Sequence, residues 1–165
     1  MNTTAILPQP GQFLPEHNGK FISATVTPAG EVWGMLYPTD VPELPKQAWG
    51  KYGQHIELAD SATNGLANTT AMAVAGNELA QAVLALPGNC YLPSRVEALQ
   101  LFAVLAGEIG TGAVWTSTQY SAGGAWAQDF YGGGQYVYLK DCELRAVPVR
   151  WVQLGSFVPF GPGLA

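Results

Sequence analysis

The residue types that carry most catalytic and metal-binding chemistry are few and scattered in this chain. Its two histidines, His17 and His55, lie far apart, and its two cysteines, Cys90 and Cys142, lack the C-x-x-C spacing of zinc and redox sites. There is no G-x-S-x-G nucleophile elbow and no pair of carboxylates in a shared apolar stretch. We therefore expect no enzymatic activity, no metal and no cofactor. We predict that both cysteines are free thiols, buried or half-buried. The alternative is a single disulfide between them.

The chain offers binding chemistry instead, in residues 115–143. Seven aromatic side chains alternate there with glutamine, serine, aspartate and glycine. Rigid aromatic rings with a polar tip among small polar residues are typical of paratopes, although tyrosine is also simply a favourable strand residue. The residues that we expect to contact a ligand are Tyr120, Asp129, Tyr131, Gln135, Tyr136, Tyr138, Lys140 and Asp141.

The elements that must position these residues alternate as strands do. Four strands are predicted, over residues 113–118, 125–131, 135–139 and 144–152, with turns at 132–134 and 140–143. Alternation places one face of each strand in the core and leaves tyrosine, aspartate and glutamine on the other. Pro148 indicates a bulge or an edge in the last strand. We therefore expect an antiparallel meander over residues 113–152.

The first half of the chain predicts a hairpin and a helix. Residues 21–37 alternate around a Pro-Ala-Gly turn, and the proline-rich stretch 38–50 must be loop. Asn68 is a good N-cap for a helix over 68–86, whose apolar residues recur at spacings of three and four. Pro87 ends that helix.

A capping box opens the second predicted helix, which covers residues 94–106 and stops at Gly107. The Ser94 hydroxyl accepts from the Glu97 amide, while the Glu97 carboxylate accepts from the Ser94 amide. We expect structural roles for Ser94, Glu97, Arg145 and Arg150, the two arginines being the charged residues of an otherwise apolar last strand.

The two ends of the chain are rich in proline and glycine. We expect an extended N-terminal arm over residues 1–19, a domain over 20–152 and an extended C-terminal tail over 153–165. Ends of this kind are rarely ordered unless something holds them. We therefore expect the arms to bury their apolar side chains against other chains of a homo-oligomer. These side chains include Phe13, Leu14, Phe157 and Phe160.

Length and charge exclude several classes of protein. The 165 residues suffice for one domain with its own core. Seven lysines and arginines against twelve acidic residues give a net charge of −5, which argues against nucleic-acid binding. The first residues lack the basic and apolar regions of a signal peptide, and no stretch approaches 18 consecutive apolar residues. We expect synthesis in a cytoplasm and no membrane insertion.

Four ordered motifs resemble a known family. They are YLPSRVE at 91–97, VWTSTQYS at 114–121, AWAQDF at 125–130 and LRAVPVR at 144–150. In this order they are similar to the family typified by the C-terminal domain of the Legionella collagen-like adhesin, over roughly residues 20–152. The resemblance implies a C-type-lectin-like fold, with two helices packed on a twisted antiparallel sheet. Val147 stands where arginine is usual, and the calcium-dependent sugar motifs of true C-type lectins are missing.

Relatives of this family occur in secreted adhesins and in phage and prophage tail proteins. Our leading hypothesis is therefore a non-enzymatic phage virion component that assembles in the host cytoplasm. It would be a tail-tip or fibre protein with a tyrosine-rich face for a host receptor or glycan, and its arms would bind other virion chains. The first alternative is a purely structural capsid-decoration or baseplate protein, and the second is a carbohydrate-binding module.

Overall fold

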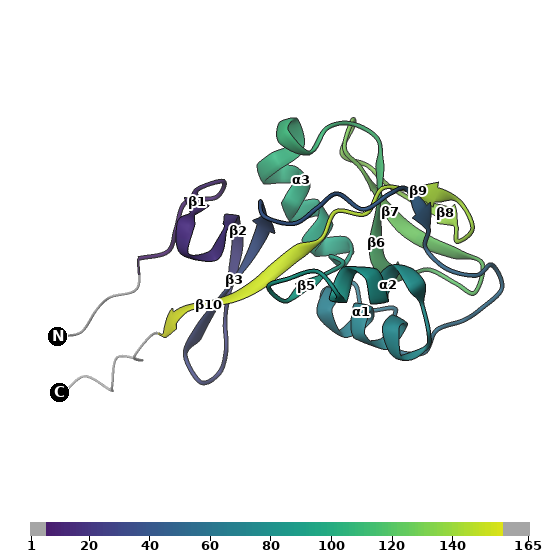
Figure 1. Ribbon diagram of the computed structural model, residues 1–165, viewed down its shortest axis with the longest axis horizontal. Coiled ribbons are helices and arrows are strands. Elements are labelled where there is room, and N and C mark those ends of the chain that lie inside the picture. Colours follow the sequence, from purple (N-terminus) through teal and green to yellow (C-terminus); the bar gives the residue numbers. More distant parts are fainter. Residues whose placement is uncertain (1–5, 157–165) are drawn as a thin grey trace, which may run out of the picture.

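The computed structural model describes residues 6–156 of the chain (Figure 1). Its α-helices are α1 (Gly65–Val74), α2 (Glu78–Leu84) and α3 (Arg95–Ile109), and a 3-10 turn covers Pro15–His17. Its strands are β1 (Phe13–Leu14), β2 (Gly19–Val26), β3 (Glu31–Pro38), β4 (Gln47–Ala48), β5 (Cys90–Tyr91), β6 (Ala113–Gln119), β7 (Gly124–Asp129), β8 (Gln135–Leu139), β9 (Glu143–Leu144) and β10 (Val149–Ser156). The predicted α+β class is confirmed.

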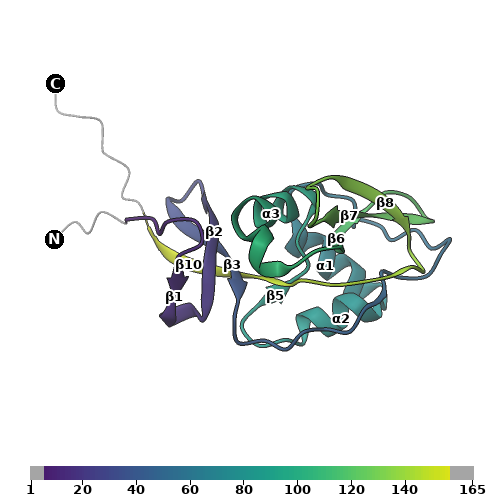
Figure 2. The same cartoon turned by 90° about the horizontal axis from the view of Figure 1, so that it is seen from above.

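The strands form one sheet of five, one of three and one isolated pair. The five-stranded sheet has the order β1-β2-β3-β10-β5, the three-stranded sheet the order β6-β7-β8, and β4 pairs with β9. All of these pairings are antiparallel. Figure 2 shows α3 between the two larger sheets. The predicted hairpin over residues 21–37 is confirmed as β2 and β3, with Gly30 at a φ of +81° in the turn.

The predicted four-stranded meander is wrong in its last strand. After β8 the chain makes the short β9, and the segment with Pro148 then carries it to the other sheet, where β10 pairs with β3 and β5. The only parallel contact in the described part of the chain is an isolated bridge between Val114 and Arg145. The segment before β10 therefore connects the two sheets, and β10 pairs the C-terminal part of the chain with the N-terminal hairpin.

The single helix predicted over 68–86 is two helices. Gly76 has a φ of +83°, and the side chain of Asn77 accepts from the Ala80 amide to cap α2. The cap of α1 is Asn64, not Asn68. Asn68 is fully buried within α1. Its side-chain Oδ1 accepts from the Ser61 backbone N–H, and its Nδ2 donates to the Ser61 backbone oxygen and the Ser117 hydroxyl.

The capping box at Ser94 and Glu97 is confirmed, and α3 begins after it as predicted. The helix does not stop at Gly107: after a kink at Leu105 (φ −126°, ψ 20°) it continues to Ile109 and ends at Gly110, whose φ is +89°. Glycine inside a helix costs about 1 kcal/mol but does not by itself end one. The helix ends at Gly110, whose positive φ lies outside the helical region and is readily adopted only by glycine.

Replacing Ser94 with alanine tests the box. We expect Ser94→Ala to lower the free energy of unfolding by about 1 kcal/mol, because the Glu97 amide loses its acceptor. Chemical denaturation measures the change, and Thr70→Ala is the control. The Thr70 hydroxyl is exposed and bonds only a carbonyl one turn back in α1. Equal losses in the two variants would contradict a special role for the cap.

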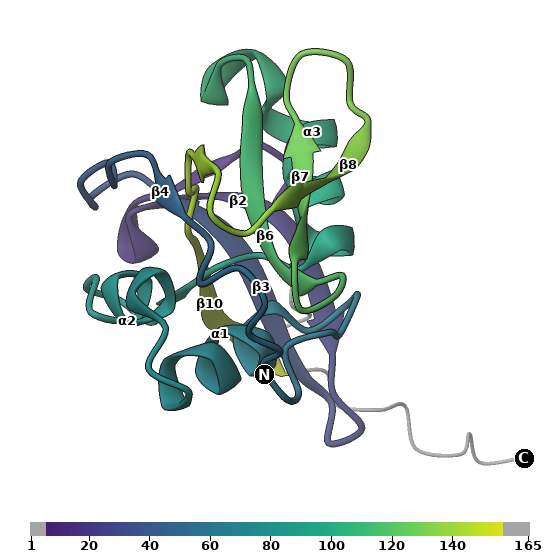
Figure 3. The same cartoon turned by 90° about the vertical axis from the view of Figure 1, so that its right-hand side faces the viewer.

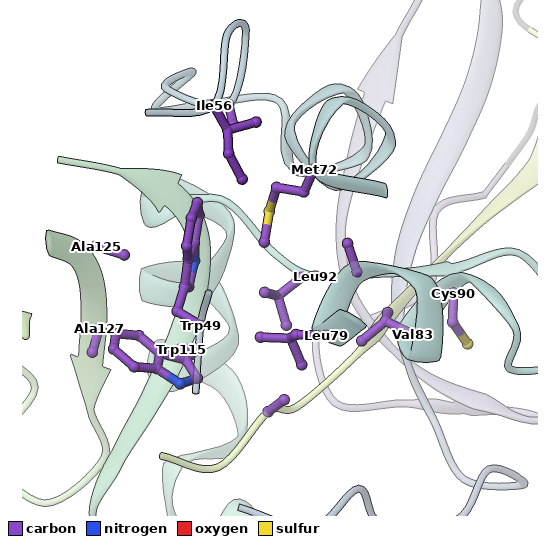
Figure 4. Packing of buried hydrophobic residues seen from close by; sticks show 13 residues of the cluster. Trp49, Ile56, Met72, Leu79, Val83, Cys90, Leu92, Trp115, Ala125 and Ala127 are labelled. Carbon is purple, nitrogen blue, oxygen red and sulfur yellow. The ribbon is translucent and has the colours of Figure 1, made fainter. Parts of the chain in front are cut away.

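Two buried clusters hold the layers together. The larger one lies between α1, α2 and the three-stranded sheet and contains Trp49 and Trp115, whose indole nitrogens donate to the backbone oxygens of Thr116 and Gln47 (Figure 4). The second joins α3 to the five-stranded sheet through residues such as Leu101. None of the helices within residues 6–156 is long and apolar enough to cross a bilayer.

Part of the predicted N-terminal arm belongs to the folded unit. β1 pairs with β2, and Leu14 is buried against Phe21 and Leu36 of the same chain. The expectation that Leu14 packs against another chain is therefore wrong, whereas Phe13 is about half exposed at 46%. At the other end β10 runs to Ser156, inside the predicted tail, and Phe157 and Phe160 lie outside the described residues.

Candidate functional site

A partly exposed aromatic pair lies on one side of the β7–β8 hairpin. Tyr120 is 62% exposed and packs edge-on against the ring of Trp126, with centroids 5.5 Å apart. Directly across the hairpin from Trp126 is Val137, and Leu139 is the next residue on that side of β8. We call this surface the Trp126 face; it comprises Tyr120, Trp126, Val137, Leu139, Arg95 and Gln135.

Arg95 fixes the geometry of the Trp126 face. Its guanidinium carbon lies 3.5 Å from the centroid of the Trp126 ring, and its Nε donates to Gln135 Oε1 at 3.2 Å. The amide of Gln135 returns a bond to the Arg95 backbone oxygen at 2.7 Å and a second to Gln128. Arg95 is the first residue of α3, directly after the capping box, so the rigid start of that helix places its side chain.

Figure 3 shows the three-stranded sheet from the side, with β8 as its free edge. The predicted ligand-binding residues do not share one face of this sheet. Residues directly opposite one another point to the same side, and Tyr136 and Tyr138 oppose Ala127 and Ala125, which are both buried. Tyr138 packs edge-on against Trp115 at 6.3 Å and belongs to the core boundary. Tyr136 is 55% exposed on that same side.

The predicted role of Lys140 as a surface contact is wrong. Its side chain is fully buried and donates to the backbone oxygen of Gln54 and to Gln119 Oε1, both at 2.6 Å. The turn that carries Lys140 folds inward, and the ammonium lies 4.7 Å from the centroid of the Trp49 ring. Asp141, the next residue, is exposed.

Asp129 and Tyr131 belong to the turn that follows β7. The carboxylate of Asp129 accepts from the amides of Tyr131 and Gly132, at 2.9 and 3.0 Å, so it shapes the turn. Tyr131 is 84% exposed. Of the eight predicted residues, only Tyr120 and Gln135 therefore lie on the Trp126 face.

Sequence reasoning missed four members of that face. They are Arg95, Trp126, Val137 and Leu139. A register centred on the predicted 132–134 turn would set Trp126 opposite Lys140, whereas the observed register sets it opposite Val137. No sequence signal indicated that the start of α3 would reach the hairpin, because that contact spans 40 positions.

Each of the four residues predicted to have a structural role makes hydrogen bonds that hold a helix end or join segments of the fold. Arg145 donates to the carbonyl oxygens of Ile109 and Thr111 and so closes the C-terminus of α3. Arg150 is 4% exposed and bonds His17, Pro87 and Asp40. Ser94 and Glu97 form the capping box of α3.

The cysteines are free thiols, one buried and one half-buried, as the sequence predicted. Burial raises the pKa of the Cys90 thiol, partly opposed by the positive charge of Arg150. Burial also raises the pKa of the Tyr91 hydroxyl, which donates to the Glu97 carboxylate at 3.0 Å. No cluster of three or more histidine, cysteine or acidic side chains that could hold a metal occurs within residues 6–156.

A groove of about 490 Å³ lies apart from the Trp126 face, where the five-stranded sheet meets the first turns of α1 and α3. The indole of Trp151 lines it beside the polar side chains of Thr25, Asn64 and Gln100. Its volume is within the range of small-molecule sites.

Comparison with known proteins adds no relative to this picture. A scan against protein-family models finds no match to the chain, and a search of curated proteins finds none either.

Proposed function

We propose that the protein is a non-enzymatic phage virion component with a C-type-lectin-like fold, a tail-tip or fibre protein that binds a host-surface receptor through the Trp126 face. The observation that carries the binding part is the preorganised group of Tyr120, Trp126 and Arg95. Tryptophan, tyrosine and arginine are the residue types that dominate protein-interface energies. Because their geometry is set before binding, little side-chain entropy remains to be lost.

Two observations support the fold part of the proposal. The four motifs that resemble the adhesin family lie in order along β5 with the capping box, β6, β7 and the β9–β10 segment. The terminal strand β10 returns to pair with the N-terminal hairpin, and the three-stranded sheet carries the candidate binding surface. The family resemblance supports the virion location.

A pair of matched tyrosine variants tests the binding face. We expect Tyr120→Ala to lower adsorption of the assembled particle to host cells about tenfold to hundredfold, roughly 1–3 kcal/mol, because the ring is exposed and packs on Trp126. Tyr136→Ala is the control. Tyr136 is similarly exposed but lies on the opposite side of the hairpin, and we expect its adsorption to change less than about threefold. Particle yield is measured beside adsorption for both variants.

The other outcomes separate the alternatives. Normal adsorption with poor particle yield for Tyr120→Ala would favour the capsid-decoration or baseplate function. Loss of adsorption in Tyr136→Ala but not in Tyr120→Ala would move the binding surface to the other side of the hairpin.

The groove beside Trp151 supports the second alternative, a carbohydrate-binding module. A sugar ring packs well on an indole face, and the neighbouring amide and hydroxyl side chains could bond its hydroxyl groups. Trp151→Ala in a glycan-array measurement tests it: loss of glycan binding in this variant, together with normal binding in Tyr120→Ala, would favour this function over the leading one.

A further inference from the structure

Lys140 is the one lysine whose side chain is fully buried in the described part of the chain. None of the ion pairs within residues 6–156 involves it. A buried ammonium without a carboxylate partner is costly. Burial accordingly lowers the pKa of Lys140 to about 8, so the side chain is mostly ammonium near neutral pH but includes a minor fraction of neutral amine. A neutral amine in a buried site is a nucleophile.

Two oxygens face this amine, the backbone oxygen of Gln54 and the carboxamide oxygen of Gln119, the last residue of β6. Lys140 Nζ lies 2.6 Å from Gln119 Oε1. The carboxamide is held on both sides by one residue, since Oε1 accepts from the Ile56 amide at 2.9 Å and Nε2 donates to the Ile56 oxygen at 3.1 Å. The amide is thus oriented, and its oxygen already faces a backbone N–H donor.

A histidine stands on the far side of the same carboxamide. His55 Nδ1 lies 3.0 Å from Gln119 Nε2, and His55 Nε2 lies 3.7 Å from the carboxylate of Glu57. The four side chains therefore follow one another as carboxylate, imidazole, carboxamide and amine. Imidazole is the side chain best suited to proton transfer near neutral pH.

We propose that Lys140 and Gln119 join through a side-chain amide bond that the folded chain forms by itself. Lys140 Nζ attacks Cδ of Gln119, and the negative charge that develops on Oε1 is stabilised by the Ile56 amide. The Nζ–Cδ bond forms, the Cδ–Nε2 bond breaks, and Nε2 leaves as ammonia. His55 in its protonated form donates the proton that Nε2 gains, and the proton that Nζ loses restores it through solvent. Nothing is oxidised or reduced, and no co-reactant is consumed.

Formation of this bond removes the cost that Lys140 carries in the folded state. The product is a neutral amide, so no charge remains buried beside Trp49. The bond would also close a covalent loop between residues 119 and 140, which contains both strands of the β7–β8 hairpin. A loop closed in this way restricts the unfolded chain, as a disulfide does. This inference does not depend on the function proposed above.

The mass of the purified full-length chain, measured after denaturation, tests the proposal. We expect it to be lower than the sequence mass by one ammonia, and we expect protease digestion to yield one peptide in which the segments around Gln119 and Lys140 are joined. The joined peptide is required because Asn64–Gly65, a sequence prone to succinimide formation, would lose the same mass. Full sequence mass in the wild-type chain after prolonged incubation, or a mass loss without a joined peptide, overturns the proposal.

Three variants sharpen the test. Lys140→Arg keeps a cation of similar length but cannot attack, so we expect the sequence mass. Lys51→Arg is the matched control, because Lys51 is an exposed lysine of the nearby loop, and the mass loss should persist. His55→Ala changes an exposed side chain and should slow accumulation of the joined species about 100-fold. Accumulation at the wild-type rate in His55→Ala would overturn the assignment of His55 as the proton donor.

Discussion

Replacing Arg150 with methionine should lower the free energy of unfolding by about 3 kcal/mol, one of the two largest single-residue effects that we expect in this protein. The Arg150 guanidinium donates to the backbone oxygens of His17 and Pro87, each at 2.8 Å, and to the Asp40 carboxylate at 2.8 Å. Methionine fills similar space but leaves both carbonyl oxygens without their donor. Urea denaturation followed by tryptophan fluorescence measures the change.

Two control variants separate the hydrogen bonds from the ion pair. The side chain of Asp40 is 39% exposed, so solvent screens its charge, and Asp40→Asn should cost less than about 1 kcal/mol. Arg150→Lys keeps the charge but cannot reach three acceptors in different directions, and should recover only part of the loss. A loss in Asp40→Asn as large as that in Arg150→Met would show that the ion pair, not the backbone contacts, carries the stability.

Arg150 also illustrates which part of the fold the sequence could predict. A charged residue in an apolar final strand indicated a structural role, and that role is what its bonds describe. Its partners could not be predicted, because they come from positions 63 to 133 residues away in the chain. Local signals such as the capping box, the hairpin turn and strand alternation were read correctly because their causes lie within a few residues.

The errors have a physical reason in common. Asn68 and Asn77 are both favourable helix caps, but tertiary contacts decide between such residues: Asn68 is buried in bonds to Ser61 and Ser117, whereas Asn77 caps α2 next to Gly76. Burial of Lys140 is likewise set by Trp49 and Gln119 from other segments. The sequence pattern predicted a binding hairpin. Which side of that hairpin is exposed is decided by the core, which covers one side, and by α3, which contacts the other.

The second large effect that we expect follows from the carboxylate of Glu97, which joins three elements. Its Oε2 accepts from the amides of Ser94 and Gly65, at 2.8 and 2.9 Å, and its Oε1 accepts from the Tyr91 hydroxyl at 3.0 Å. One side chain thus serves the first turns of both α1 and α3, where a negative charge is favourable. Glycine is required at 65, because a Cβ there would lie 2.4 Å from Oε2 and 2.6 Å from the backbone oxygen of Leu92.

Glu97→Ala should therefore lower the free energy of unfolding by about 3 kcal/mol, because three donors lose their acceptor at once. Glu97→Gln should cost about 1 kcal/mol, since its oxygen can still accept from the two amides and its NH₂ can donate to the Tyr91 oxygen. Glu78→Ala, at an exposed position in the first turn of α2, is the control and should cost less than about 0.5 kcal/mol. If Glu97→Ala and Glu78→Ala destabilised the protein equally, the junction at Glu97 would be an ordinary helix-end charge, and the close approach of α1 to α3 would need another cause.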